Sequence, residues 1–359
     1  MATFALDRIA IRAIAAAVPR QTERNEDYIR LSEQERALLI KTTGVRERRI
    51  APKGLTTTDL CAAAAGEILD KLNIQKEEIG LLIFVSQSGD YYLPASATLL
   101  QERLGLNTGT IAFDVGLGCS GYIYGLAIAG SLMQTCGVKK ALLLAGDVSS
   151  IVASPEDKST YPLFGDAGSA TLLEITTPGT PWEFNLMTDG SGADTIMVPD
   201  GLNRNGVNQD SFTMEMVSEG IKRSRLNLIL KGPEIFAFAI KEVPASIQAL
   251  SRHSGQAIED LDYFVMHQAN KLMNETIRKK LAIPEHKVPY SLDEFGNTSS
   301  ASIPLTLVTR LHDKLASETL RLLLSGFGVG LSWGNVFLET ASLYCPPLLE
   351  IADNDGPLS

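Results

Sequence analysis

Basic residues are scarce in this chain of 359 residues. Its 32 Lys and Arg oppose 42 Asp and Glu, which gives a formal net charge of −10 at pH 7. Nucleic-acid binders contact phosphates through a basic face, so we expect no nucleic-acid partner and no docking on an anionic membrane. A membrane-spanning helix needs about 18 consecutive apolar residues, and the sequence has no such run.

Cysteine is also scarce, and no cysteines have the close spacing of metal ligands. The cysteines are Cys61, Cys119, Cys136 and Cys345. They predict no metal site, and such sparse usage suits a reducing cytoplasm, where we expect the protein to reside. Asp7, Arg8 and Arg12 interrupt the apolar stretch at residues 5–17, so we interpret it as a strand and not as a signal peptide.

A dinucleotide-binding fingerprint is missing as well. Residues 164–168 and 326–334 are glycine-rich, but no helix pattern follows the second stretch. A phosphate-binding loop leads directly into a helix, so we do not assign one to either stretch. A tight hairpin or a close approach of two backbones fits both better.

The sequence does contain a regular alternation of strand-like and helix-like segments. Hydrophobic residues make up 45% of the chain and charged residues 21%, as in an ordinary globular protein. The alternation predicts α/β layering, and the length predicts two domains or one double-sized unit.

This alternation occurs twice. Strand-like segments recur in the same order, displaced by about 180 residues for the first three and somewhat less for the last: 78–85 and 260–267, 104–113 and 281–290, 141–146 and 321–326, 168–174 and 333–339. Amphipathic helices at about 57–72 and 242–254 precede the first pair. Such continuous apolar runs predict strands that are buried on both faces.

The duplication predicts two similar α/β halves. We place the N-terminal half at residues 1–174 and the C-terminal half at 225–345. Between them, residues 175–224 are polar and rich in Gly and Asp, which predicts a connection running over the surface. Residues 346–359 form a tail.

Cys119 is the first candidate functional residue. It lies in a glycine-flanked turn between a predicted strand at 110–115 and a helix rich in Gly and Ala. At a helix N-terminus, free N–H groups and the helix dipole favour the thiolate, a nucleophile, and can hold an oxyanion beside it. A free cysteine is more often a buried structural residue, so this motif needs support from the rest of the chain.

His267 and Asn297 provide that support. His267 follows the second copy of the strand at 78–85, and Asn297 lies where the duplication places the counterpart of Cys119. Ligand sites in α/β sheets lie at the carboxyl ends of strands, so we expect these side chains to meet. Alternatively, His267 caps its strand and Asn297 is a helix N-cap. We interpret the other histidines as surface or structural residues: His253, His286 and His312.

Together these segments resemble the β-ketoacyl-acyl carrier protein synthase III family, which has the thiolase fold. The resemblance spans nearly the whole chain and is carried by residues 43–48, 118–121, 267–270, 296–303 and 328–334. It implies pseudo-symmetric halves in an α/β/α/β/α arrangement and a homodimer. It also implies a role in fatty-acid initiation or in a specialised acyl or polyketide pathway.

The resemblance implies that Cys119, His267 and Asn297 catalyse a decarboxylating Claisen condensation. Cys119 carries the acyl group, and the backbone N–H groups of Cys119 and Val329 hold its carbonyl oxygen. His267 and Asn297 donate hydrogen bonds to the enolate formed from malonyl-acyl carrier protein; the amide stays neutral at every pH. The substrates are thioesters of coenzyme A or a carrier protein, and no metal or redox cofactor is expected.

The chain departs from the family around the acyl donor. Leu38, Thr42 and Lys158 stand where the family's fatty-acid initiators usually carry Trp, Arg and Arg. This loss of stacking groups argues against acetyl-CoA and favours a longer or different acyl group, delivered on a carrier protein. We assign the acyl pocket to Phe327 and to Leu93, which replaces a Phe that the partner subunit often contributes.

A basic helix follows His267 and is the candidate docking site for an acidic acyl carrier protein. Its basic residues are Lys271, Arg278, Lys279 and Lys280. Alternatively, they form an ordinary solvated helix face.

Three rival functions explain the sequence less well. An acyltransferase of the thiolase fold that moves the acyl group to an alcohol or amine, without decarboxylation, would leave Asn297 with little to do. A non-catalytic scaffold would have little reason to keep Cys119, His267 and Asn297. A papain-like protease has a different cysteine context and does not explain the duplication.

Overall fold

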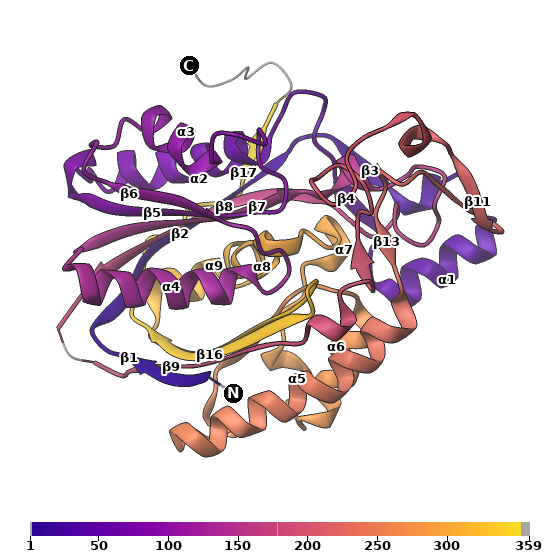
Figure 1. The fold of residues 1–359 in the computed structure, drawn as a ribbon. Helices are drawn as coiled ribbons and strands as arrows, with labels where there is room; N and C mark the ends of the chain where they lie inside the picture. Colours follow the sequence, from indigo (N-terminus) through magenta and orange to yellow (C-terminus); the bar gives the residue numbers. More distant parts are fainter. Residues whose placement is uncertain (1, 178, 353–359) are drawn as a thin grey trace.

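The computed structural model shows two β-sheets alternating with three layers of helices (Figure 1). It describes residues 2–177 and 179–352. The central helical layer lies between the sheets, and one outer layer covers the far face of each sheet. This α/β/α/β/α arrangement is the one expected from the sequence. No helix in the described ranges is long and apolar enough to cross a membrane.

The first sheet has six strands, mostly from the N-terminal half. Their order is β17 (Leu349–Ile351), β2 (Ile9–Pro19), β8 (Asp166–Ile175), β7 (Lys140–Val148), β5 (Ile79–Val85) and β6 (Ile111–Val115). β5 pairs in parallel with both β6 and β7, whereas β8 runs antiparallel to β7 and β2. The strands predicted at 78–85, 110–115, 141–146 and 168–174 are therefore confirmed.

The second sheet repeats most of this order with five strands. They are β1 (Ala2–Leu6), β9 (Trp182–Thr188), β16 (Ser332–Thr340), β15 (Leu320–Gly328) and β14 (Tyr263–Met266). β14 and β15 are parallel, like β5 and β7, and β16 is antiparallel to β15, like β8 to β7. β15 and β16 form the hairpin predicted for the glycine-rich stretch at 326–334, with Gly328 paired to Ser332.

Helices separate and cover the sheets. The central layer holds α4 (Gly121–Cys136), α8 (Ser302–Arg310) and α9 (His312–Ser317). The outer layers hold α2 (Thr57–Lys71) and α3 (Ser96–Arg103) on one side, and α5 (Gly232–Ser254) and α6 (Lys271–Lys280) on the other. One apolar core surrounds the central helical layer and contacts both sheets, and a separate core lies under each outer helical layer.

Local sequence explains how these helices begin and pack. Thr56 and Asp59 form a reciprocal capping box that starts α2. Gly125 lets α4 lie close against the first sheet, because a Cβ there would stand 2.6 Å from Cδ1 of Leu143. A close backbone approach is also confirmed at Gly165, where a Cβ would meet the carbonyl oxygen of Phe295 at 2.2 Å.

The structure differs from the predicted organisation in the connection and at both ends of the chain. Residues 182–188 of the connection form β9, a central strand whose Trp182 and Phe184 are buried. β1 joins the second sheet, and β17 of the predicted tail joins the first. The predicted boundaries therefore do not coincide with the sheets, because these strands pair with partners distant in sequence.

One copy of the duplicated strand is also missing. The segment at 281–290, expected to match the one that ends in β6, is not a strand in its final residues but a turn and a short 3-10 helix, Glu285–Lys287. Pro284 and Pro289 lie in this segment, and proline lacks the N–H group that a sheet ladder requires. The helix expected at about 242–254 is α5, which begins earlier, at Gly232.

Smaller elements surround one end of the sheets. They are α1 (Glu33–Thr43), α7 (Leu292–Phe295), the hairpin of β3 (Thr22–Arg24) with β4 (Glu47–Arg49), the hairpin of β11 (Glu215–Ser218) with β12 (Ile221–Arg223), and the pair β10 (Ile196–Met197) and β13 (Ile229–Leu230).

Candidate active site

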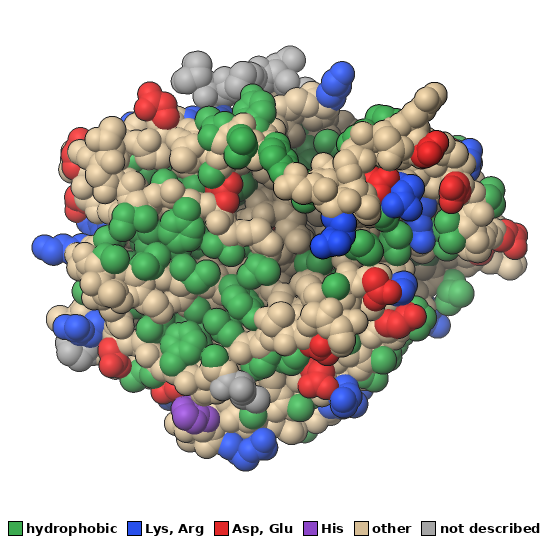
Figure 2. Space-filling view, viewed as in Figure 1, with side chains coloured by type: hydrophobic (Ala, Val, Ile, Leu, Met, Phe, Trp, Pro, Cys, Tyr) green, Lys and Arg blue, Asp and Glu red, His purple; other side chains and the backbone are tan. Residues whose placement is uncertain are grey.

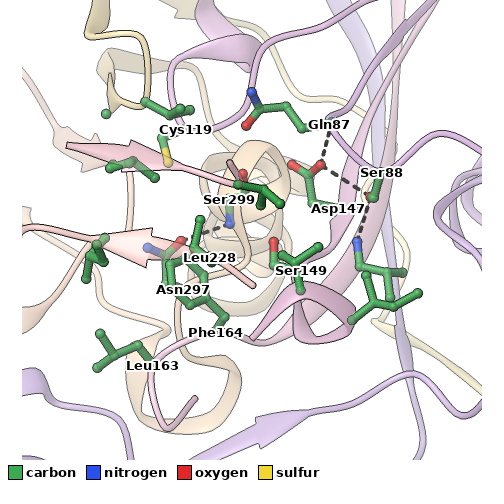
Figure 3. Close-up of a pocket in the computed structure, with 18 of the residues that line it drawn as sticks. Gln87, Ser88, Cys119, Asp147, Ser149, Leu163, Phe164, Leu228, Asn297 and Ser299 are labelled. Atoms are coloured by element: carbon green, nitrogen blue, oxygen red, sulfur yellow. Dashed lines mark hydrogen bonds between the residues drawn. The ribbon is translucent and has the colours of Figure 1, made fainter. Parts of the chain in front are cut away.

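A cavity of about 590 Å³ lies where the two halves meet, at the carboxyl ends of the parallel strands. Cys119 follows β6, and His267 follows β14. Asn297 enters from the second half, just before α8. All three line this cavity, so the structure brings together the side chains that the sequence predicted to meet (Figure 3 labels Cys119 and Asn297).

Cys119 sits in the turn between β6 and α4, with 9% of its surface exposed. The β15–β16 hairpin approaches it closely at Gly328. A Cβ added to Gly328 would lie 2.6 Å from Cβ of Cys119 and 2.9 Å from its sulfur. No other residue type fits there without displacing the thiol, which explains the glycine in this turn.

Burial keeps the Cys119 thiol protonated at neutral pH. It raises the pKa of Cys119 from 9.0 to about 11, and the Asp147 carboxylate acts in the same direction. Hydrogen bonds from the N–H of Val329, from the hydroxyl of Ser299 and from the N–H of Cys119 itself lower the pKa but do not compensate. The expectation that the helix start makes the thiolate the favoured form is therefore wrong, because desolvation outweighs the N–H groups.

The same N–H groups are the ones predicted to hold the acyl carbonyl oxygen. The backbone N–H groups of Val329 and Cys119 both lower the pKa of the thiol, as donors beside the sulfur do. They approach it from two elements, the β15–β16 hairpin and the β6–α4 turn. Donors of this kind, aimed at a common point, form an oxyanion hole when a carbonyl carbon is attached to the sulfur.

His267 is fully enclosed, with 1% of its surface exposed. Its backbone N–H donates to the carbonyl of Ser325 at 2.8 Å, and its Nδ1 lies 2.7 Å from Oγ of Ser302. Burial lowers the pKa of His267 to about 3, against a smaller raising effect of the Ser299 backbone. The ring is therefore neutral, and it can donate through Nε2 when the Ser302 hydroxyl donates to Nδ1.

Asn297 is held by the opposite half of the molecule. Its N–H donates to the carbonyl of Leu163 at 2.8 Å, and its own carbonyl accepts from Gly165 at 3.1 Å. Its side-chain Oδ1 accepts from the N–H of Ser299 at 2.9 Å (Figure 3). Because the oxygen is occupied, the Nδ2 donors remain for the cavity. The alternative that Asn297 is a helix N-cap is wrong, because Ala301 is the N-cap of α8 and Asn297 bonds Ser299 in the turn before it.

Arg48 anchors the loop that holds Asn297, a function the sequence did not reveal. Its guanidinium is 2% exposed and donates to the carbonyls of Tyr161 at 2.5 Å and Phe164 at 3.0 Å. A third hydrogen bond, 2.9 Å long, joins it to Glu23. The only hint in the sequence was the position of Arg48 within the motif at 43–48.

Asp147 joins the two halves beside the cavity and was likewise not predicted. Its buried carboxylate accepts from the N–H of Gln87 at 2.7 Å and from Oγ of Ser86 at 3.1 Å, both in the first half. It also accepts from the N–H and the hydroxyl of Ser300, at 3.2 and 2.8 Å, in the second half. Burial raises the pKa of Asp147.

The two predicted acyl-pocket residues lie in different places. Phe327 lines the cavity, is 1% exposed and contacts the ring of His267 edge to face, with centroids 5.6 Å apart. Leu93 is 78% exposed and does not line the cavity of its own chain. It lies on a loop with Tyr91 and Tyr92, which are exposed as well.

The predicted docking residues lie on α6, but two of them are engaged within the chain. Arg278 makes hydrogen bonds to both carboxylate oxygens of Glu275, and Lys280 donates to a backbone carbonyl of α5 at 2.9 Å. Lys271 and Lys279 are exposed and have no ion-pair partner in the described part of the chain. The structure thus leaves these two charges free.

A cysteine enclosed at the junction of two pseudo-symmetric α/β halves, with a neutral histidine and an oriented amide beside it, defines an acyl-thioester enzyme of the thiolase fold. Comparison with known proteins identifies the family within this class. The family model of 3-oxoacyl-(acyl-carrier-protein) synthase III matches residues 113–190, and that of its C-terminal part matches residues 252–340.

Whole-chain relatives agree. The β-ketoacyl-(acyl-carrier-protein) synthase III of Chlamydia caviae is 33% identical over 334 residues, 92% of this chain and 97% of that protein. The structure of a 3-oxoacyl-(acyl-carrier protein) synthase from Burkholderia xenovorans superposes with a TM-score of 0.92 at 35% identity, covering 98% of this chain and 99% of that one. The priming β-ketosynthase of the R1128 polyketide pathway gives a TM-score of 0.80 at 25% identity, over 95% and 98% of the two chains. The chain belongs to the β-ketoacyl-acyl carrier protein synthase III family.

Proposed function

We propose that this protein condenses an acyl thioester with malonyl-acyl carrier protein, releasing CO₂ and a β-ketoacyl product. The observation that carries the proposal is the convergence of Cys119, His267 and Asn297 in one cavity at the junction of the halves. Membership of the family supports the reaction type.

In the first step the sulfur of Cys119 attacks the donor thioester. A carbon–sulfur bond forms to Cys119, the bond to the donor thiol breaks, and the proton of Cys119 leaves with that thiol. The negative charge that develops on the carbonyl oxygen is held by the N–H groups of Cys119 and Val329. Each such preorganised donor contributes about 3 kcal/mol to the transition state.

In the second step malonyl-acyl carrier protein loses CO₂. The electrons of the broken carbon–carbon bond form an enolate, whose oxygen accepts from Nε2 of the neutral His267 and from Nδ2 of Asn297. The enolate carbon then attacks the acyl group, and the thiolate of Cys119 departs and takes up a proton. Neither step uses a metal or a redox cofactor.

Parallel reactions of the wild type, Cys119→Ala and Cys136→Ala test this function. Cys136 is the matched control, because it is the exposed cysteine at the end of α4. With an acyl donor and malonyl-acyl carrier protein, we expect the wild type and Cys136→Ala to release CO₂ and a β-ketoacyl product, and Cys119→Ala to form none. Acyl transfer to an alcohol or amine without CO₂ would establish the rival acyltransferase instead.

We further propose that the acyl donor arrives on a carrier protein and is not acetyl-CoA. Leu38 and Thr42 are exposed on α1, and Lys158 is paired with Glu35 at 3.5 Å. This set offers no aromatic or guanidinium plane on which an adenine could stack. Loading of Cys119 from a panel of donors, followed by mass spectrometry, tests this point; efficient loading from acetyl-CoA alone would contradict it.

The exposed end of α6 is our candidate for the carrier-protein contact. Charge reversal by Lys279→Glu should raise the apparent KM for malonyl-acyl carrier protein by a few-fold with little effect on kcat, because a rim charge steers encounter. Lys241→Glu on α5, where Lys241 is 82% exposed, is the matched control. Equal KM values for both variants would remove α6 from the docking surface.

We also propose a homodimer through the edge of the first sheet. Among residues 2–177 and 179–352, no strand pairs with the outer side of β6, and its Ile111 is 40% exposed. Hydrophobic side chains gather over this region and α4 (Figure 2). Bare, apolar edges of this kind are normally covered. A dimer would also explain the exposure of Leu93 if it reaches the partner's cavity. A monomeric mass by light scattering would overturn this proposal.

A further inference from the structure

Two polar side chains in the cavity wall have no role in the proposed mechanism. Gln87 follows β5, and Ser149 follows β7, so both lie at the carboxyl ends of adjacent parallel strands. Both line the cavity that holds Cys119 and Asn297. Figure 3 shows the carboxamide of Gln87 directed toward Cys119 and Ser149 lower on the same wall.

Ser88 and Asp147, polar residues near them in the sequence, are engaged within the protein, whereas these two side chains are not. Oγ of Ser88 accepts from the N–H of Val148 at 2.9 Å and contacts Oγ of Thr57 at 2.7 Å. Asp147 accepts from both halves, as described above. In the described part of the chain, no hydrogen bond engages the carboxamide of Gln87 or the hydroxyl of Ser149, although the main chain of Gln87 is fixed by Asp147.

The turn that carries the nucleophile makes room for this carboxamide. A Cβ added to Gly118, the residue before Cys119, would lie 2.4 Å from Oε1 of Gln87. The carboxamide oxygen therefore packs against the main chain beside Cys119. A group attached to the sulfur of Cys119 would lie next to one free acceptor and one free donor of Gln87.

Apolar side chains also line this cavity. They include Leu163, Phe164, Leu228 and Phe327. A plain alkyl chain would suit these residues but would remove water from Gln87 and Ser149 without replacing its hydrogen bonds, which is unfavourable. A hydroxyl group both donates and accepts, and so matches a carboxamide and a serine hydroxyl.

From this arrangement we infer that Gln87 and Ser149 form a subsite for a hydroxyl group on the acyl chain, close to the thioester. The substrate class is thus hydroxyacyl thioesters instead of unsubstituted ones. This inference rests on the proposed function, since it assumes that Cys119 is acylated. Discrimination arises in the acylation step, before malonyl-acyl carrier protein binds.

Acylation rates with matched donors test the subsite. Butanoyl, 2-hydroxybutanoyl, 3-hydroxybutanoyl and 4-hydroxybutanoyl groups are loaded on one acyl carrier protein, and the acyl adduct on Cys119 is followed by mass spectrometry without malonyl donor. We expect one hydroxylated donor to react about five- to tenfold faster than butanoyl, the gain from one net hydrogen bond. Gln87→Leu should bring that ratio close to unity, and Ser149→Ala should reduce it.

Gln248→Leu is the matched control, because Gln248 is exposed on α5 and far from this wall in the sequence. It should retain the wild-type ratio. A ratio of unity or below in the wild type, or a preference that survives Gln87→Leu, would overturn the subsite while leaving the condensing function intact. Absence of any adduct from every donor would contradict the proposed function and the subsite together.

Discussion

β6 completes the first sheet beside β5, whereas in the described residues the second sheet ends at β14 with no such neighbour. In the first half, the turn from β6 into α4 holds Cys119, so regular local structure places this side chain. In the second half, Asn297 is placed by main-chain hydrogen bonds to Leu163 and Gly165 of the first half. The duplicated halves therefore position their side chains by different means, one local and one across the molecule.

Under the proposed function, we expect this difference to separate the two half-reactions. Acylation of Cys119 would depend on the β6–α4 turn and on the hairpin that carries Val329. Enolate formation would depend on Asn297, and hence on the loop at 161–165 that Arg48 holds from the other half. Variants that separate the two half-reactions test whether the division is real.

Removal of the amide should have the largest effect. We expect Asn297→Ala to slow decarboxylation of malonyl-acyl carrier protein by roughly 10²–10³, since a preorganised donor to the enolate is lost. Acylation of Cys119 should change only a few-fold. Release of labelled CO₂ and mass spectrometry of the acyl adduct measure the two steps. Equal losses in both would mean that Asn297 supports the whole site and not the enolate.

The second variant, Gly328→Ala, changes the hairpin that packs against Cys119 and should affect acylation more than decarboxylation. Its methyl group would meet Cβ and the sulfur of Cys119 at 2.6 and 2.9 Å, so the thiol must move. Misplacement by about 1 Å costs on the order of a hundredfold, and we expect that loss in acylation. Gly206→Ala, which meets nothing within 4 Å, is the control. Unchanged acylation would show that the thiol is not held against this hairpin.

Arg48→Lys tests the connection across the molecule. Lysine keeps the charge but cannot form the fork that binds Tyr161, Phe164 and Glu23. We expect decarboxylation to fall about tenfold, consistent with a small displacement of Asn297. Acylation should fall less, and circular dichroism reports whether the fold persists. A loss confined to acylation would contradict the role of Arg48 as a positioning residue for Asn297.

We expect the smallest effect from Asp147→Asn, which removes the carboxylate that joins the two halves. Burial and the Asp147 carboxylate raise the pKa of Cys119, so alkylation by iodoacetamide should increase with pH towards about 11. Asp147→Asn removes the smaller of these two effects, and the alkylation profile should move to lower pH. The variant's decarboxylation should also fall, because Ser300 loses a charged acceptor. A profile that stays in place would show that Asp147 acts on geometry alone.

Local pattern was sufficient to predict most strands and the three central side chains. Apolar runs showed where β5, β7, β8 and their second copies lie, and residues at the ends of strands predicted that Cys119, His267 and Asn297 would meet. Their catalytic roles stay predictions until the variants are measured. The thiolate was wrongly favoured, because a turn in the sequence does not reveal how completely the folded protein excludes water from the sulfur.

Contacts between distant residues could not be predicted. The bond from Arg48 to Phe164 spans 116 positions, and that from Ser300 to Asp147 spans 153. Neither residue stands out locally, since an arginine in a polar motif and an aspartate after a glycine are common on surfaces. The exchange of β1 and β17 between the sheets has the same origin, because strand pairing depends on tertiary neighbours.

That exchange has a consequence for the order in which the chain can fold during synthesis. β9 leaves the ribosome with β1 as its available neighbour, but its other edge must wait for β16, which is made near the end of the chain. At ordinary translation rates this bare edge persists for several seconds. The first sheet also receives its last strand, β17, only after the second sheet is complete. Neither half is a finished folding unit when it emerges, so a gene split between the halves would yield fragments with open, aggregation-prone edges.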